Sequence, residues 1–218
     1  RFKKAAVTGF GLAGGISVFN AAQQAIGFVT DAIGDSTRAY REDQQSQVQL
    51  RAALEANIEG WNGNTDAIEE VIAARMKLGF SDDEQRASLS LLVAQVGDVN
   101  DALAIQRTAM DLARLKGSSL ADTATLLAKA YNGSATGRNK LGIKLASGTK
   151  GMKAIAEVQK RAAGQAEAWG NTSAGAAAAL DVKVGELQES FGRFIDGPAM
   201  LFTGFLSGVV DVLDGPEG

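Results

Sequence analysis

Three consecutive helices are predicted by residues 81–133, which read SDDEQRASLSLLVAQVGDVNDALAIQRTAMDLARLKGSSLADTATLLAKAYNG. The first begins with a capping box, in which Ser81 and Glu84 can satisfy each other's backbone N–H groups. Asp82 and Asp83 suit the positive end of the helix dipole, so these acids have a structural role. Apolar residues recur at spacings of three and four, which places them on one face of each helix. The segment is therefore expected to pack as a compact helical subdomain.

The remainder of the chain has a composition typical of helices. Only two of the 218 residues are proline, and both lie beyond residue 197. Glycines stand where the helical patterns stop, at Gly79, Gly97, Gly117 and Gly133. The sequence therefore predicts an all-α protein.

Composition also removes most of the chemistry that enzymes use. The chain has no cysteine and no histidine, which eliminates the usual zinc ligands, thiol nucleophiles and imidazole bases. Its net charge is −3 without a long basic run, so sequence-specific nucleic acid binding is not expected. We therefore predict no enzyme, and assign no catalytic residue, no cofactor and no metal ligand.

An uncharged stretch over residues 5–30 is long enough to cross a bilayer as a helix. Polar residues interrupt it, so a buried or oligomer-interface helix is the favoured interpretation and a membrane segment is the alternative. In the alternative, the membrane-facing residues are Phe10, Leu12, Ile16, Phe19, Ile26 and Phe28. The composition turns polar after Asp31, which predicts a solvated continuation of the same long helix to a turn near Gly60.

The C-terminal part contains a heptad pattern. An Ala-rich helix is expected from Met152 toward Trp169, followed by apolar residues at spacings of four, three, four and three. These residues are Leu180, Val184, Leu187, Phe191 and Phe194. The pattern spans barely two heptads, so two interpretations remain open. The apolar residues form an interface with another copy or a partner, or the helix packs on its own chain. We predict four regions: a long helix over residues 1–60, a helical subdomain over 61–133, a Gly- and Lys-rich linker over 134–151, and C-terminal helices over 152–218. The whole is expected to be part of a longer protein.

Three sets of acidic residues are candidates for a functional site. Glu189 could act as the acid of a peptidoglycan hydrolase, but it lies on the polar face between Leu187 and Phe191, which predicts a solvated side chain. Acids at 69–70 and 82–84 could bind a hard cation, yet adjacent carboxylates on a helix point apart. They are expected to be charges at helix N-termini.

An ordered set of short motifs is spread over residues 79–192. It comprises GFS at 79–81, GD at 97–98, AL at 102–103, DLARLKG at 111–117, LAD at 120–122, KAYNG at 129–133, LG at 141–142, WGNTSA at 169–174 and LQESFG at 187–192. In this order, the set resembles the helical region of phage tail tape measure proteins.

The resemblance implies a structural role and not an enzymatic one. Such a protein occupies the lumen of the tail tube in several copies, sets tail length and leaves ahead of the DNA on infection. Its expected partners are other copies of itself, tail tube and tail tip or hub proteins, and tail assembly chaperones. Its expected locations are the virion, in the tail tube lumen or tip, and the host cell envelope on ejection, with insertion of the apolar helices into the host membrane. The alternatives are a membrane-active pore-forming helical protein and a tail-associated peptidoglycan hydrolase.

Overall fold

The computed structural model describes residues 15–143 and 145–196, with the backbone alone for 15–29 and 196. This part of the chain is helical and contains no strand, which confirms the all-α prediction. The elements are α1 (Gly15–Asn57), α2 (Asp66–Arg75), the 3₁₀ helix η1 (Met76–Leu78), α3 (Asp82–Val96), α4 (Val99–Lys116), α5 (Leu120–Tyr131), α6 (Ala135–Lys140), α7 (Met152–Ala162), α8 (Gln165–Gly170) and α9 (Ser173–Asp196).

Helix boundaries follow the local signals in the sequence. The capping box opens α3: the backbone N–H of Glu84 donates to Ser81 Oγ, and the N–H of Ser81 donates to Glu84 Oε2, each over 3.2 Å. Asp98 and Ser119 cap α4 and α5 with a single such bond each, because their side-chain oxygens accept from the backbone N–H groups of Asp101 and Asp122. Left-handed glycines end η1, α3 and α4, and these are Gly79, Gly97 and Gly117. Because capping depends on residues three or four apart, it can be predicted from sequence.

The hydrophobic core lies among α3, α4 and α5, and the C-terminal end of α1, helices α2, α7 and α8, and the segment after α6 also contribute buried side chains. Its largest fully buried side chains include Leu50, Leu89, Leu92, Ile105, Leu112, Leu127 and Ile155. Burial of each such side chain stabilises the fold by about 1.5–3 kcal/mol relative to exposure. Among the residues whose side chains are described, none of those that form this core belongs to α9.

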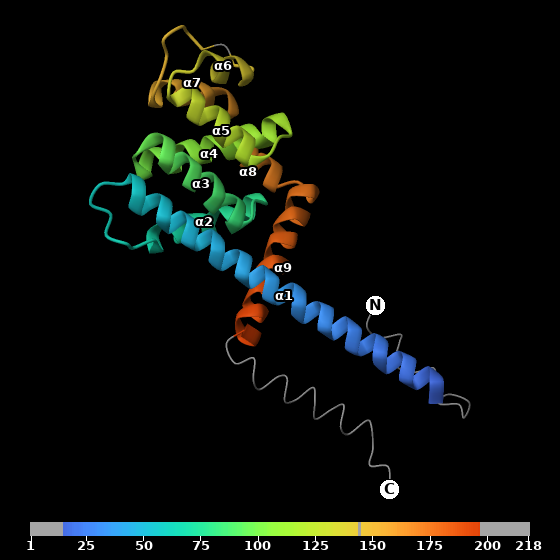
Figure 1. Cartoon of the computed structure of the whole chain (residues 1–218). Coiled ribbons are helices and arrows are strands. Elements are labelled where there is room, and N and C mark those ends of the chain that lie inside the picture. Colours follow the sequence, from blue (N-terminus) through green and yellow to red (C-terminus); the bar gives the residue numbers. More distant parts are fainter. Residues whose placement is uncertain (1–14, 144, 197–218) are drawn as a thin grey trace.

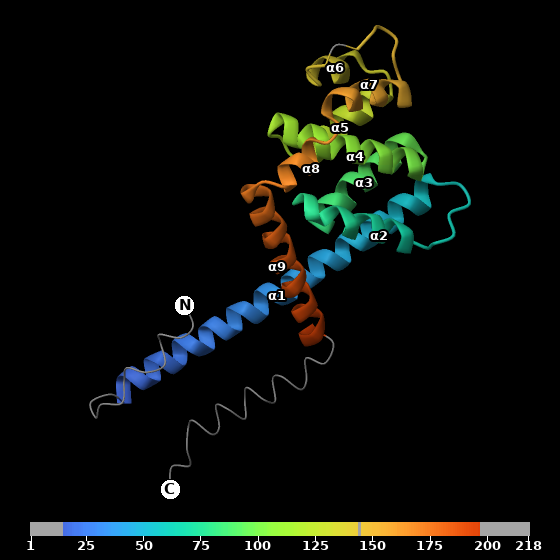
Figure 2. The same cartoon turned by 180° about the vertical axis from the view of Figure 1, so that it is seen from behind.

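Helix α9 crosses α1 outside that core. Figures 1 and 2 show the crossing from opposite sides, with α1 projecting beyond the helical bundle. Gly192 is buried at the crossing, and a Cβ there would collide with the carbonyl oxygen of Ser36. A glycine at this position therefore allows the two backbones to approach closely.

Two segments differ from the expected pattern. The single helix predicted from Met152 toward Trp169 is wrong, because α7 and α8 are separated at Gly164, which has a left-handed φ of 79°. The region 134–151 contains α6, and its Leu141 and Ile143 are buried in the core. This region therefore packs on the bundle.

Candidate functional site

The polar face of α9 points into the molecule. Glu186 and Glu189 are half-buried against α1 and α3. The prediction that Glu189 is solvated is therefore wrong, because the helix pattern identifies which residues share a face but not the direction in which that face points.

Arg86 of α3 binds carboxylates from three helices. Its Nη1 lies 2.6 Å from Asp43 Oδ1 of α1 and 2.6 Å from Asp82 Oδ2 of α3 itself. Its Nη2 lies 2.9 Å from Glu69 Oε2 of α2. The side chains of Arg86, Asp43 and Asp82 are each at most 7% exposed, so these are buried ion pairs. Arg86 also approaches Asp83, at 3.6 Å.

Helix α9 adds two more carboxyl groups to this arrangement. Carboxylate oxygens of Asp43, Asp82 and Glu189 all lie within 4.8 Å of one another, and Glu186 shares a hydrogen bond with Asp82. We call the whole group the carboxylate cluster, and it comprises Asp43, Glu69, Asp82, Asp83, Glu186 and Glu189 around Arg86. Four of these carboxyl groups lie beside the guanidinium, and the two of α9 lie beside its partners Asp43 and Asp82.

Burial, together with crowding of like charges, raises the pKa of several carboxyl groups of the cluster. Burial, then the neighbouring charges of Asp82 and Asp43, raise the pKa of Glu186 to about 7. Burial, then Asp82 and Glu186, raise the pKa of Glu189 to about 8. Burial also raises the pKa of Asp82, although Arg86 opposes the shift. Near neutral pH the two glutamates of α9 are therefore substantially protonated.

Burial lowers the pKa of Arg86, but the hydrogen bonds that its guanidinium donates to Glu69 and the charges of Asp82, Glu69 and Asp43 outweigh burial and raise it overall. Arg86 therefore stays positive at all relevant pH values. Its guanidinium already contacts both Asp43 and Asp82, so we do not assign metal ligands here, although three close carboxylates are a geometry that a hard cation accepts.

The opposite face of α9 is apolar and exposed. We call this the α9 apolar face, and it consists of the five residues of the heptad pattern. Their exposed fractions are 61% for Leu180, 46% for Val184, 69% for Leu187, 47% for Phe191 and 75% for Phe194. Within the part of the chain that the structure describes, α9 packs on α1 of its own chain through the opposite face, and the heptad residues do not make that contact. Large apolar side chains in a row mark an interaction surface.

The beginning of α9 is attached by a separate contact. Arg114 of α4 stacks between the rings of Phe80 and Trp169, 4.0 and 3.5 Å from their centroids. Its Nη2 also donates to the carbonyl oxygens of Leu78 and Gly79. This stack joins α4 to α8, the helix that leads directly into α9.

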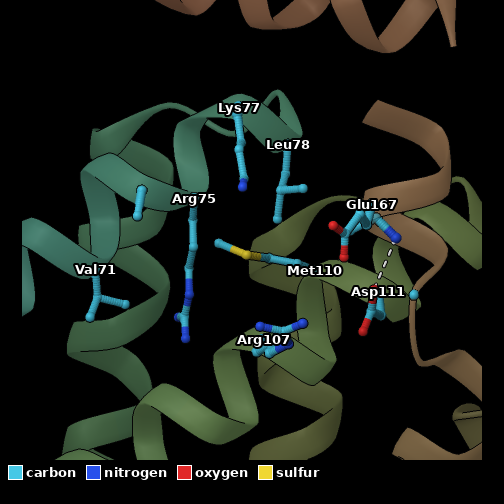
Figure 3. A pocket seen from close by; sticks show the side chains of 11 residues that line it. Val71, Arg75, Lys77, Leu78, Arg107, Met110, Asp111 and Glu167 are labelled. Atoms are coloured by element: carbon cyan, nitrogen blue, oxygen red, sulfur yellow. Dashed lines mark hydrogen bonds between the residues drawn. The ribbon is translucent and has the colours of Figure 1, made fainter. Parts of the chain in front are cut away.

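A hollow of about 390 Å³ with both apolar and charged lining residues lies between α2, η1, α4 and α8 (Figure 3). Arg75, Lys77 and Arg107 line it together with Asp111 and Glu167. Several of these groups already have partners, since Arg75 Nη1 donates to Gln106 over 2.7 Å and Asp111 accepts from the N–H of Ala166 over 2.9 Å. The hollow is therefore built largely from side chains that hold α2, α4 and α8 together.

The candidate membrane segment is not tested by these contacts. Phe10 and Leu12 lie outside the described residues, and the side chains of Ile16, Phe19, Ile26 and Phe28 do so as well. Of the helices in the described ranges, none is both long and apolar enough to span a bilayer.

Comparison with known proteins gives no assignment: no family model, curated protein or solved structure matches the chain.

Four residues of the cluster stand out in the sequence as acids, and these are Glu69, Asp82, Asp83 and Glu189. No motif in the sequence singles out Arg86, Glu186 or the buried Asp43. Asp82 and Arg86 are four residues apart on α3, a spacing that indicates an ion pair. Nothing local connects Asp43 or Glu189 to that pair.

Proposed function

We propose that this chain is a self-associating, structural helical segment of a phage tail tape measure protein, in which the α9 apolar face contacts other copies. The observation that carries the proposal is the exposure of that face. The motif order over residues 79–192 supplies the connection to phage tails.

The area of the face suits a contact between copies. Its five side chains together expose about as much surface as three large apolar side chains in isolation, roughly 500 Å². Two copies would then bury about 1,000 Å², which reaches the lower limit of specific interfaces. Spacings of four and three match the knobs-into-holes packing of a helix that carries the same repeat.

Charge does not oppose such a contact. Asp181 and Lys183 flank the face, are exposed and have opposite signs, so two copies bring no block of like charge together. Because the repeat spans barely two heptads, the association of isolated chains is expected to be weak. Confinement of several copies in a tail tube would strengthen it by raising their effective concentration.

Self-association can be tested by sedimentation over a range of concentrations. Leu187→Glu puts a charge at the centre of the face and is expected to abolish any concentration-dependent increase in mass. Val48→Glu is the matched control, because Val48 of α1 is 66% exposed outside the face. A wild-type chain that stays monomeric at all concentrations would contradict the proposal, as would equal effects of the two substitutions.

The role in the tail requires a separate experiment on phage. An in-frame deletion of residues 81–131 removes 51 residues, which correspond to about 77 Å of helix. Tails shortened by up to about 77 Å would mean that the segment is extended and contributes to length. Tails of unchanged length with impaired infection would mean that it serves tip assembly or delivery as a folded unit. Normal tails with normal infection would refute the tail function.

A further inference from the structure

Helix α9 is held on the molecule by few interactions of the kind that stabilise the rest of the fold. The hydrophobic core, within the part of the chain whose side chains are described, contains no α9 residue. The beginning of α9 follows the Arg114–Trp169 stack, whereas its C-terminal half lies on α1 through Gly192 and the carboxylate cluster. An element attached in this way can separate while the core persists.

We propose that shared protons in the carboxylate cluster hold the C-terminal half of α9 against α1 and α3, so that α9 docks in acid and is released as the cluster ionises. This inference rests on the cluster alone and does not depend on the proposed tail function.

All elements at the crossing contribute charge to the cluster. Asp43 comes from α1, Glu69 from α2, Asp82, Asp83 and Arg86 from α3, and Glu186 and Glu189 from α9. Beside the cluster, the guanidinium of Arg193 of α9 lies 5.8 Å from the ring centroid of Tyr40 of α1, which adds one positive charge to the crossing. Since Arg86 already has several carboxylates around it, ionisation of both α9 glutamates adds repulsion at the crossing.

The direction of the pH dependence follows from the two glutamates. Below about pH 4.5 they are protonated whether α9 is docked or free, so docking is strongest. Between pH 4.5 and about 8, free α9 must take up protons in order to dock, and the docking equilibrium falls as the pH rises. Above about pH 8 the docked glutamates ionise as well, and the equilibrium levels off at its lowest value.

The expected size of the effect is moderate. Uptake of one proton changes the equilibrium about tenfold per pH unit, but the glutamates are only half-buried and solvent screens them. We expect the ratio of docked to released α9 to fall about ten- to hundredfold between pH 5 and pH 9.

The chain has no cysteine, so two spin labels can be placed on it without removing native thiols. Gln45→Cys on α1 and Gln188→Cys on α9 place both labels on exposed positions near the crossing. Electron–electron distance distributions are recorded from pH 5 to pH 9 in EDTA, so that no divalent cation replaces the protons. Dilution with unlabelled chain removes distances between copies, which separates this test from that of self-association.

The expected result is a single short distance at pH 5 that gives way to a broad, longer distribution at pH 9. Glu186→Gln with Glu189→Gln imitates the protonated state and is expected to stay docked throughout. Asp181→Asn, on an exposed part of α9 outside the cluster, should respond like the wild type. Equal distributions at pH 5 and pH 9, or an unchanged response in the double glutamine variant, would overturn the proposal. If the double variant does not fold, Glu189→Gln alone must reduce the response for the proposal to stand.

Discussion

Replacement of Arg86 by methionine tests whether the carboxylate cluster is as buried and as charged as its geometry indicates. Methionine retains most of the volume of the aliphatic stem but removes the guanidinium. Three carboxylates, on Asp43, Glu69 and Asp82, then lose contacts of 2.6–2.9 Å. Loss of one partner from a buried ion pair costs about 3–5 kcal/mol, because the remaining charge stays buried without compensation.

The expected loss is therefore about 3–5 kcal/mol of unfolding free energy at pH 7, measured by urea denaturation followed by circular dichroism. At pH 4 the loss should shrink to about 1–2 kcal/mol, because protonated carboxyl groups no longer require a counter-charge. Arg38→Met is the matched control on α1. It breaks the Arg38–Asp35 pair, whose side chains are 68% and 59% exposed, and should cost under about 1 kcal/mol.

Two results would refute this reasoning. A loss for Arg86→Met as small as that for Arg38→Met would mean that water screens the cluster. A loss at pH 4 equal to that at pH 7 would mean that packing of the side chain, and not its charge, stabilises the crossing.

Two further predictions concern the attachment of α9. Gly192→Ala should cost about 1–3 kcal/mol of unfolding free energy and loosen α9, because a Cβ at this position collides with the carbonyl group of Ser36. Gly185→Ala is the control: its Cβ meets no atom within 4 Å, so it should stabilise the helix by up to about 1 kcal/mol. Hydrogen exchange of α9 measures both effects, and equal protection in the two variants would contradict the close crossing. Arg114→Ala should lower the unfolding free energy by about 2 kcal/mol, because the cation–π stack and two hydrogen bonds to carbonyl oxygens are lost. It should also shift the fluorescence emission of Trp169. An unchanged emission spectrum would show that the stack does not persist in solution.

Local signals explain why the helices of the bundle could be predicted from the sequence. The capping box at Ser81 and the left-handed turns at Gly97 and Gly117 involve residues within five positions of one another, so the sequence contains the whole interaction. The break at Gly164 was missed because the Ala-rich pattern continues across it. High helix propensity on both sides of a glycine does not reveal whether that glycine interrupts the helix.

The carboxylate cluster could not be predicted for a different reason. Arg86 and Asp43 are 43 residues apart in sequence, and Glu189 follows Arg86 by more than 100 residues, so only the fold brings them together. The heptad spacing places the five apolar residues of α9 on one face. Whether that face is buried or exposed depends on which side of α9 packs against α1, and the spacing does not determine this. Here α1 offers Asp43, Ser36 and a close glycine contact, which suit the polar face of α9.

The two faces of α9 act together on its position. Inside, crowded carboxyl groups must retain protons for the helix to stay docked; outside, a row of apolar side chains is exposed to water. Ionisation of the carboxyl groups raises the free energy of the docked helix relative to the released one, whereas the apolar face is exposed to water in both forms. Among the residues whose side chains are described, none of α9 belongs to the hydrophobic core, so core contacts do not offset the repulsion. A partner that binds the apolar face more tightly when α9 is released than when it is docked would favour release. Because a rise in pH also favours release, it would strengthen the binding of that partner to α9. If the docked form binds the partner better, the same linkage gives the opposite sign, so the pH dependence of self-association identifies the form of α9 that associates.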